Sequence, residues 1–123
     1  MCFIISKNYP NELTAEKDIV CWKLLLKKKI NGKIRYFAPI MDYYEYIPYK
    51  LQKELKLVDD KYGNIYVGYH SFISRDIALL MTWHGGLVAH RFIIPQGARY
   101  YMNNKVYISS NIIFSPPKKK GHV

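Results

Sequence analysis

The amino-acid sequence predicts an α+β fold in which a mostly antiparallel, twisted β-sheet carries one main helix at about residues 75–84. Two tight-turn signals, Asn31-Gly32 and Asn103-Asn104, each separate two runs that have the apolar pattern of strands, which is typical of β-hairpins. Ser74 has the character of a helix N-cap, and Asp76 is favourable in the turn that follows it. Half of the residues are hydrophobic, which is enough to form one core.

The chain is expected to form a single domain, because 123 residues are too few for two domains of ordinary size. Residues 1–17 are expected to form an N-terminal arm, with a turn at 8–11 where asparagine and proline cluster. Residues 18–114 would form the compact α+β domain. Residues 115–123 hold prolines, lysines and a glycine that cannot pack, so this basic tail is expected to be disordered.

In the first half of the domain, a hairpin is expected to join strands at 18–27 and 34–40 across the Asn-Gly turn. The segment 41–51 is rich in tyrosine and is interrupted by Pro48, which predicts an irregular or edge-strand conformation. Residues 51–57 suit a helical turn and a short strand equally, and both alternatives stay open.

In the second half, a turn cluster at 59–64 precedes a strand candidate at 65–72. The helix would follow this strand and end at the glycine pair 85–86. Further strands are predicted at 87–94, 98–102, 105–109 and 111–114.

The chain is strongly basic, with 19 lysines and arginines against 9 aspartates and glutamates and a net charge of +10. Such a balance favours a polyanionic partner, such as nucleic acid, a nucleotide or an acidic membrane surface, although many small proteins are simply basic. No carboxylate side chain follows Asp76. The rest of the chain therefore lacks an Asp or Glu for acid–base chemistry or for a metal, but it supplies the positive charge and aromatic faces that suit an anionic, base-bearing ligand.

The most site-like stretch is the Gly-Tyr-His-Ser-Phe strand end together with the helix start that follows it. A helix N-terminus offers N–H groups and a partial positive charge to an anion. Ser71, Ser74 and Arg75 are therefore candidates to hold a phosphate, with Tyr69 or His70 in contact with a base or sugar. The alternative is an ordinary strand-to-helix connection with a satisfied histidine.

A second candidate stretch follows the Pro-Gln-Gly turn, where Arg99 stands beside Tyr100 and Tyr101. Adjacent residues of a strand point to opposite faces, so one tyrosine is expected in the core and the other would be free to stack on a base. Arg91 adds positive charge on the preceding strand. Tyr43 belongs to the tyrosine-rich segment, which would form either a pocket wall or part of the core.

The sequence carries no recognisable motif for catalysis, a cofactor or a metal, and a binding protein is expected rather than an enzyme. There is no P-loop, GxGxxG or GxSxG, and the four histidines lack metal-ligand spacing. Cys2 and Cys21 form no CxxC pair, and Cys21 is expected in the core. Cys2 as a processed N-terminal nucleophile would lack the partner residues that such chemistry requires.

The apolar start of the chain is broken at Ser6, Lys7 and Asn8, so no signal peptide is expected. No apolar run approaches the roughly 18 residues that a membrane span needs. These features predict a cytoplasmic location with reduced thiols and without a membrane partner. Whether the chain forms a homo-oligomer is left open.

Four segments follow one another in a recognisable order: Cys-Trp-Lys at 21–23, Gly-Tyr-His-Ser-Phe at 68–72, Ile-Pro-Gln-Gly-Ala-Arg-Tyr-Tyr at 94–101 and Val-Tyr-Ile-Ser-Ser-Asn-Ile-Ile at 106–113. This order resembles that of small uncharacterised phage and gut-bacterial proteins that begin with Met-Cys and share a YHSF … IPKGxxYY … YVSxxI pattern. The similarity spans most of residues 18–114.

The resemblance to phage proteins implies a role against bacterial defence. Among small basic phage proteins, one class sequesters the cyclic nucleotides or ADP-ribose derivatives that serve as immune signals. Such a protein needs a phosphate-complementary, aromatic-lined pocket and no catalytic acid. The leading hypothesis is therefore a phage-type anti-defence protein that binds and sequesters a nucleotide signal in the cytoplasm of the infected host.

Two alternatives stay open. The first is a sequence-tolerant single-stranded nucleic-acid-binding protein that uses the lysines at 27–29, 33 and 118–120. The second is an ADP-ribosyltransferase-like enzyme, since a Gly-Tyr-His strand before a helix is distantly similar to the Gly-Phe-His strand of those folds. The late-strand catalytic glutamate of those enzymes has no counterpart here, because nothing acidic follows Asp76.

Overall fold

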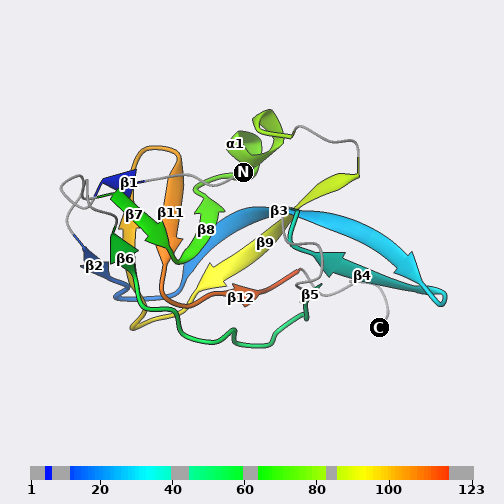
Figure 1. Ribbon diagram of the computed structural model, residues 1–123, viewed down its shortest axis with the longest axis horizontal. Helices are drawn as coiled ribbons and strands as arrows, with labels where there is room; N and C mark the ends of the chain where they lie inside the picture. Colours follow the sequence, from blue (N-terminus) through cyan, green and yellow to red (C-terminus); the bar gives the residue numbers. More distant parts are fainter. Residues whose placement is uncertain (1–4, 7–11, 40–44, 60–63, 83–85, 117–123) are drawn as a thin grey trace.

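The computed structural model describes residues 5–6, 12–39, 45–59, 64–82 and 86–116. These residues form two antiparallel sheets and one short helix (Figure 1). The larger sheet has nine strands in the order β12-β9-β3-β8-β11-β10-β2, with β4 paired to β3 and β5 paired to β4; the smaller has the order β1-β7-β6. The elements are β1 (Ile5–Ser6), β2 (Leu13–Thr14), β3 (Ile19–Ile30), β4 (Lys33–Phe37), β5 (Glu45–Tyr46), β6 (Val58–Asp59), β7 (Asn64–Val67), β8 (Tyr69–Phe72), α1 (Arg75–Leu80), β9 (Leu87–Ile94), β10 (Arg99–Met102), β11 (Val106–Ser109) and β12 (Ile113–Phe114).

The long strand β3 is the centre of the larger sheet. One of its edges pairs with β9 over eight residues, from Ile19 opposite Ile94 to Leu26 opposite Leu87. Its other edge pairs first with β8, at Trp22, and then with β4 from Leu26 onward. The first half of β3 therefore lies inside the sheet, and the second half is paired with β4 (Figure 1).

Alternation along β3 divides the core into two clusters, one on each face of the sheet. Cys21 and Leu25 belong to the cluster that contains Phe92 and Phe114, and we call their side the aromatic face. Leu24 belongs to the other cluster, to which α1 contributes its buried Ala78, so this side is the helix face. The residues that complete the two buried clusters are Ala15, Tyr46, Tyr69, Ile94, Ala98, Tyr107 and Ile112 on the aromatic face, and Phe72, Leu87, Tyr101, Val106 and Ile108 on the helix face.

The segment between β5 and β6 runs along β12 and covers an edge of the aromatic face. The backbone N–H groups of Tyr49, Gln52 and Leu55 donate to carbonyls of the 110–114 segment, with N–O distances of 2.7, 3.2 and 2.8 Å. Leu51 forms an isolated bridge to Ile113. Residues 51–57, which suited a helical turn and a short strand equally, are therefore an extended segment that pairs with the 110–114 segment without forming a regular strand.

Both predicted hairpins are confirmed. Asn31 and Gly32 adopt φ angles of 51° and 79° between β3 and β4, which is the geometry that an Asn-Gly turn favours. The second hairpin joins β10 to β11, and the Asn103 side-chain oxygen accepts from the backbone N–H groups of Lys105 and Val106 at 2.8 and 2.9 Å. An asparagine that replaces backbone hydrogen bonds in this way stabilises the turn.

The helix begins where the sequence predicts but ends earlier. Ser74 is the N-cap, and its hydroxyl accepts from the Ile77 N–H at 3.2 Å. The helix ends at Leu80, and Met81 is its C-cap, so the prediction of helix to about residue 84 is too long. Of the glycine pair on which that prediction depended, Gly86 directly precedes β9, and Gly85 lies outside the described residues. With so short a helix, the fold is nearly all-β within the described residues.

The segment predicted as an N-terminal arm contributes to the sheets in its described parts. β1 pairs with β7, and β2 pairs with β10. Ala15 is buried, and its N–H and carbonyl each form a 2.8 Å hydrogen bond, to the Ala98 carbonyl and from the Gly97 N–H. Strands of two residues have no periodicity that sequence reading can detect. None of the helices in the described residues is long and apolar enough to cross a membrane.

Gly68 divides the strand predicted at 65–72 into β7 and β8. Its φ angle of +149° is one that residues with a Cβ rarely adopt. A Cβ at this position would also lie 2.5 Å from Cγ2 of Ile108 and 2.8 Å from Cδ2 of Leu57. The sharp break between the two strands therefore needs glycine for its backbone conformation and for space.

Gly68→Ala is expected to destabilise the fold more than Gly97→Ala. Both substitutions strain a positive φ, at a cost of about 1–3 kcal/mol, but no atom lies within 4 Å of a Cβ at Gly97. Overpacking should add about 1–3 kcal/mol at Gly68 alone. Urea denaturation of the two variants measures the difference, and equal losses in the free energy of unfolding would show that the close approach to Ile108 carries no cost.

Candidate functional site

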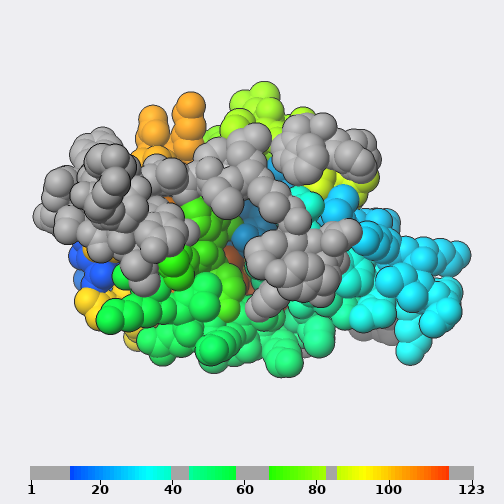
Figure 2. Space-filling view, in the orientation of Figure 1, coloured from blue at the N-terminus to red at the C-terminus, as the bar shows by residue number. Residues whose placement is uncertain are grey.

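Beyond Leu26, β3 leaves the body of the sheet and continues with β4 as a ribbon, whose base also pairs with β5 at Tyr36 and Phe37. Leu26 is the last residue of β3 that pairs with β9, and the ribbon's own pairs run from Lys27 opposite Tyr36 to Ile30 opposite Lys33. In Figures 1 and 2 this hairpin extends beyond the rest of the molecule. We call residues 27–37 the basic ribbon.

Positive side chains occupy both faces of the basic ribbon. Because side chains alternate along each strand and opposed residues share a face, Lys27 and Lys29 lie on one face. Lys28, Lys33 and Arg35 lie on the other. Four of these five side chains are exposed, and Lys28 is half-buried.

Two of the five cations are held at the base of the ribbon. Arg35 donates from Nε to Oε2 of Glu45 at 2.7 Å and from a terminal nitrogen to Oε1 at 2.5 Å. The hydrogen-bonded pair raises the pKa of Arg35 and lowers that of Glu45. The Lys28 ammonium and the Arg35 guanidinium lie 5.1 and 5.5 Å from the centre of the Phe37 ring, where cation–π attraction is effective.

The other three cations have no ion-pair partner within the part of the chain that the structure describes. Among the described residues, no carboxylate forms an ion pair with Lys27, Lys29 or Lys33. Three like charges within a few residues repel one another, and a polyanion that approaches them relieves this repulsion. The ribbon therefore presents a positive surface that no described carboxylate offsets at these three lysines.

Aromatic packing anchors the ribbon to the sheet. The Tyr36 ring contacts the His90 and Phe114 rings edge-on, with centroids 4.6 and 5.3 Å apart. Burial, reinforced by the charge of Lys27, lowers the pKa of His90, so its ring is held neutral near pH 7. Phe114 in turn stacks on Phe92 at 4.9 Å. The ribbon's direction is thus fixed by the core of the aromatic face.

Three of the predicted site residues are part of the core. Tyr69, Ser71 and Tyr101 are 7, 2 and 9% exposed. The Tyr69 hydroxyl donates to the Lys53 carbonyl. Tyr101 lies on the helix face and Tyr100 on the aromatic face, where its half-buried ring is 5.9 Å from that of Tyr107. One tyrosine of the pair is in the core, as predicted, and the other packs beside a neighbouring strand.

The predicted site residues around the helix start lie in different environments. The Ser74 hydroxyl caps α1, and Arg75 is exposed on the first turn of a six-residue helix. His70 is half-buried, and its carbonyl accepts from the Lys23 ammonium. Arg91 donates from Nε to the Ser115 carbonyl at 2.9 Å. Tyr43 lies outside the described residues.

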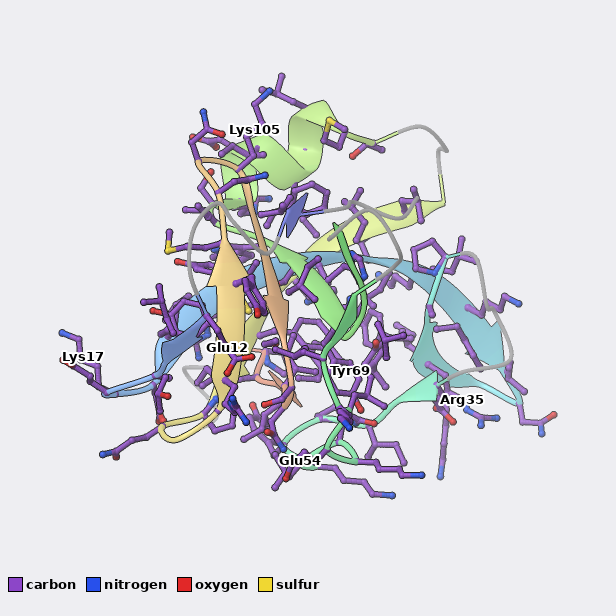
Figure 3. All side chains as sticks on the ribbon, turned by 60° about the vertical axis from the view of Figure 1, so that its left-hand side comes forward. Glu12, Lys17, Arg35, Glu54, Tyr69 and Lys105 are labelled. Atoms are coloured by element: carbon purple, nitrogen blue, oxygen red, sulfur yellow. The ribbon has the colours of Figure 1, made fainter. Side chains whose placement is uncertain are left out.

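Of the predicted residues, Arg99 lines a groove that described residues form. This groove has a volume of about 500 Å³ and is formed by Glu12, Glu54, Leu55, Lys56, Leu57, Arg99 and Ser110. Arg99 forms an ion pair with Glu12. Figure 3 shows where Glu12 and Glu54 lie relative to Tyr69. The groove thus combines two cations, Lys56 and Arg99, with the carboxylates of Glu12 and Glu54.

Comparison with protein-family models, with curated proteins and with solved structures finds no match for this chain. The described residues also contain no group of three His, Cys, Asp or Glu side chains that would hold a metal ion. The resemblance to phage proteins stays a prediction.

Cys21 is expected to resist alkylation at pH 8 until the protein unfolds. Burial raises the pKa of its thiol to about 12, and the Ser71 hydroxyl and the Lys23 charge offset only part of this shift. At pH 8 the thiolate, which is the reactive form, should be about 10⁻⁴ of the folded population. A Cys2→Ser variant leaves one thiol to follow with iodoacetamide, and modification without urea at the rate of a free cysteine would contradict the burial.

The raised pKa of the Cys21 thiol also predicts how the stability of the fold depends on pH. The unfolded chain loses its Cys21 proton near pH 9, whereas the folded chain keeps it to about pH 12. The contribution of Cys21 to the free energy of unfolding is therefore fully present below pH 9. It falls as the pH rises above 9, by up to about 1.4 kcal/mol per pH unit. Cys21→Ala should flatten this decline in urea titrations between pH 9 and 10.

Proposed function

We propose that the protein binds nucleic acid through the basic ribbon and does so without catalysis. The observation that carries the proposal is the set of three lysines, Lys27, Lys29 and Lys33, that no described carboxylate neutralises on a hairpin extending from the body. Phosphate groups are the natural partners of such a surface, since each contact releases condensed counterions.

The chemistry of the ribbon favours tolerance of sequence. Lysine ammonium groups contact phosphates as point charges, and phosphate contacts position a protein without reading bases. The one described ribbon cation with the bidentate geometry that reads guanine, Arg35, is already paired with Glu45. Binding is therefore expected to depend strongly on salt and weakly on sequence.

Replacing Lys27, Lys29 and Lys33 together by glutamine should weaken nucleic-acid binding about 10-fold or more at low salt. The slope of log affinity against log salt should become shallower by about 3, because each lost phosphate contact removes close to one unit. Fluorescence anisotropy with a labelled oligonucleotide over a salt series measures both quantities.

The matched control replaces Lys17, Lys53 and Lys105 by glutamine. These three lysines are also exposed, and Figure 3 shows Lys17 and Lys105 well away from Arg35 on the ribbon. The control changes the net charge by the same amount. If it lowered the affinity and the salt slope as much as the ribbon variant, binding would follow net charge alone and the ribbon would lose its role.

A second candidate function is sequestration of a nucleotide signal, the role that the phage resemblance implies. It is favoured by the groove that Arg99 and Lys56 line, because its volume of about 500 Å³ is in the range of small-molecule sites. A ligand phosphate would replace the Glu12 carboxylate as the partner of the Arg99 guanidinium.

This second candidate predicts opposite effects from the two members of the ion pair. Arg99→Ala should weaken binding of a cyclic dinucleotide or an ADP-ribose isomer roughly 10- to 100-fold, the value of a charge-assisted hydrogen bond. Glu12→Gln should strengthen it, because a competing carboxylate is removed. Thermal shift with these ligands tests the pair, and ligand recovered chemically intact would show binding without turnover. No shift with any of them would exclude the groove as a nucleotide site.

A further inference from the structure

We infer that the nucleic acid bound by the basic ribbon is duplex DNA, and that the ribbon enters its major groove. This inference rests on the proposed nucleic-acid binding and goes beyond it, because sequence analysis favoured a single strand as the nucleic-acid partner. Three observations support it: the placement of charge on both faces, the packing of the ribbon's two aromatic rings against other side chains, and the ribbon's dimensions.

The charge of the ribbon is divided between its two faces. Lys27 and Lys29 project from one face and Lys33 from the other. A groove has a phosphate backbone on each side, so a ribbon inside it uses the lysines of both faces. A single strand that lies along one face would leave the cation on the opposite face without a phosphate.

The aromatic side chains of the ribbon are already occupied. Proteins that bind single strands combine positive charge with aromatic rings on which bases stack. In the basic ribbon, the Tyr36 ring packs between His90 and Phe114, and Phe37 is only 7% exposed beneath Lys28 and Arg35. All residues of the ribbon are described, and of its two aromatic rings Phe37 is buried and Tyr36 is half-buried against two other rings. The ribbon thus suits a partner whose bases remain stacked on one another.

The dimensions of the ribbon match a DNA groove. The ribbon's own pairs, from Lys27–Tyr36 to Ile30–Lys33, extend over three residue steps, or about 10 Å at 3.4 Å per residue. The major groove of B-form DNA is about 12 Å wide and 8.5 Å deep, and it admits a two-stranded ribbon. The major groove of duplex RNA is too narrow for such an element. A hairpin of this length can therefore enter the groove, with its lysine side chains reaching toward the phosphates on either side.

The ribbon is also held in place before binding. It continues the core strand β3 without a break, and the Arg35–Glu45 pair fastens β4 to β5. A prearranged element loses little conformational freedom when it binds.

The test compares three fluorescent ligands of one sequence: a DNA duplex of about two helical turns, its single strand, and the corresponding RNA duplex. The full-length protein should bind duplex DNA at least about 10-fold more tightly than either alternative at physiological salt. Methyl green, which occupies the major groove, should displace the protein, whereas netropsin in the minor groove should not.

Two variants test whether both faces are used. Lys27→Gln with Lys29→Gln should reduce the salt slope for duplex DNA by about 2, and Lys33→Gln should reduce it by about 1. An effect from only one of these variants would overturn insertion into a groove. Equal or tighter binding of single-stranded DNA or duplex RNA would overturn the inference and leave nucleic-acid binding standing. Failure to bind any of the three ligands would overturn the proposed function as well.

Discussion

The eight-residue pairing between β3 and β9 is the constraint on which the rest of the structure depends. It sets which side chains of β3 lie on the aromatic face and which lie on the helix face, because a slip of one residue would exchange them. It also determines where the ribbon begins. The ladder with β9 ends at Leu87, so the strand partner of β3 beyond Leu26 is β4. The core and the candidate binding surface are therefore two parts of one strand.

Local chemistry could be predicted from the sequence, and long-range pairing could not. The Asn31-Gly32 turn and the Ser74 cap depend on a few adjacent residues, and both were predicted correctly. The end of α1 depends on how the chain returns to the sheet, so the predicted helix was too long. Residues 51–57 have no regular pattern, because their backbone pairs with isolated carbonyls of the 110–114 segment. That partner lies about sixty residues away in the chain.

The candidate site shows the same division between local chemistry, which could be predicted, and long-range pairing, which could not. Tyr69, Ser71 and Tyr101 were chosen for their chemical types, but β8 and β10 pair inside the sheet and both of its faces are covered there. A strand pattern cannot tell which face is covered by other elements. The signal for the ribbon is visible in the sequence as a lysine run before an Asn-Gly turn, and the sequence assigns these lysines to the nucleic-acid-binding alternative. The role proposed for these lysines depends on the hairpin extending past β9. That extension follows from the register between β3 and β9, which could not be predicted from the sequence.

The distance in sequence between β3 and its main partner has a consequence for biosynthesis. Ile19 pairs with Ile94 and Leu26 with Leu87, so the ribosome must add more than sixty residues before β3 can find β9. At about 5–20 residues per second, the apolar first half of β3 waits for several seconds without its partner. During this time it is an exposed segment of high β-propensity, of the kind that aggregates. The lysine run that follows it directly has the position of a gatekeeper, whose charge opposes the approach of a second nascent chain.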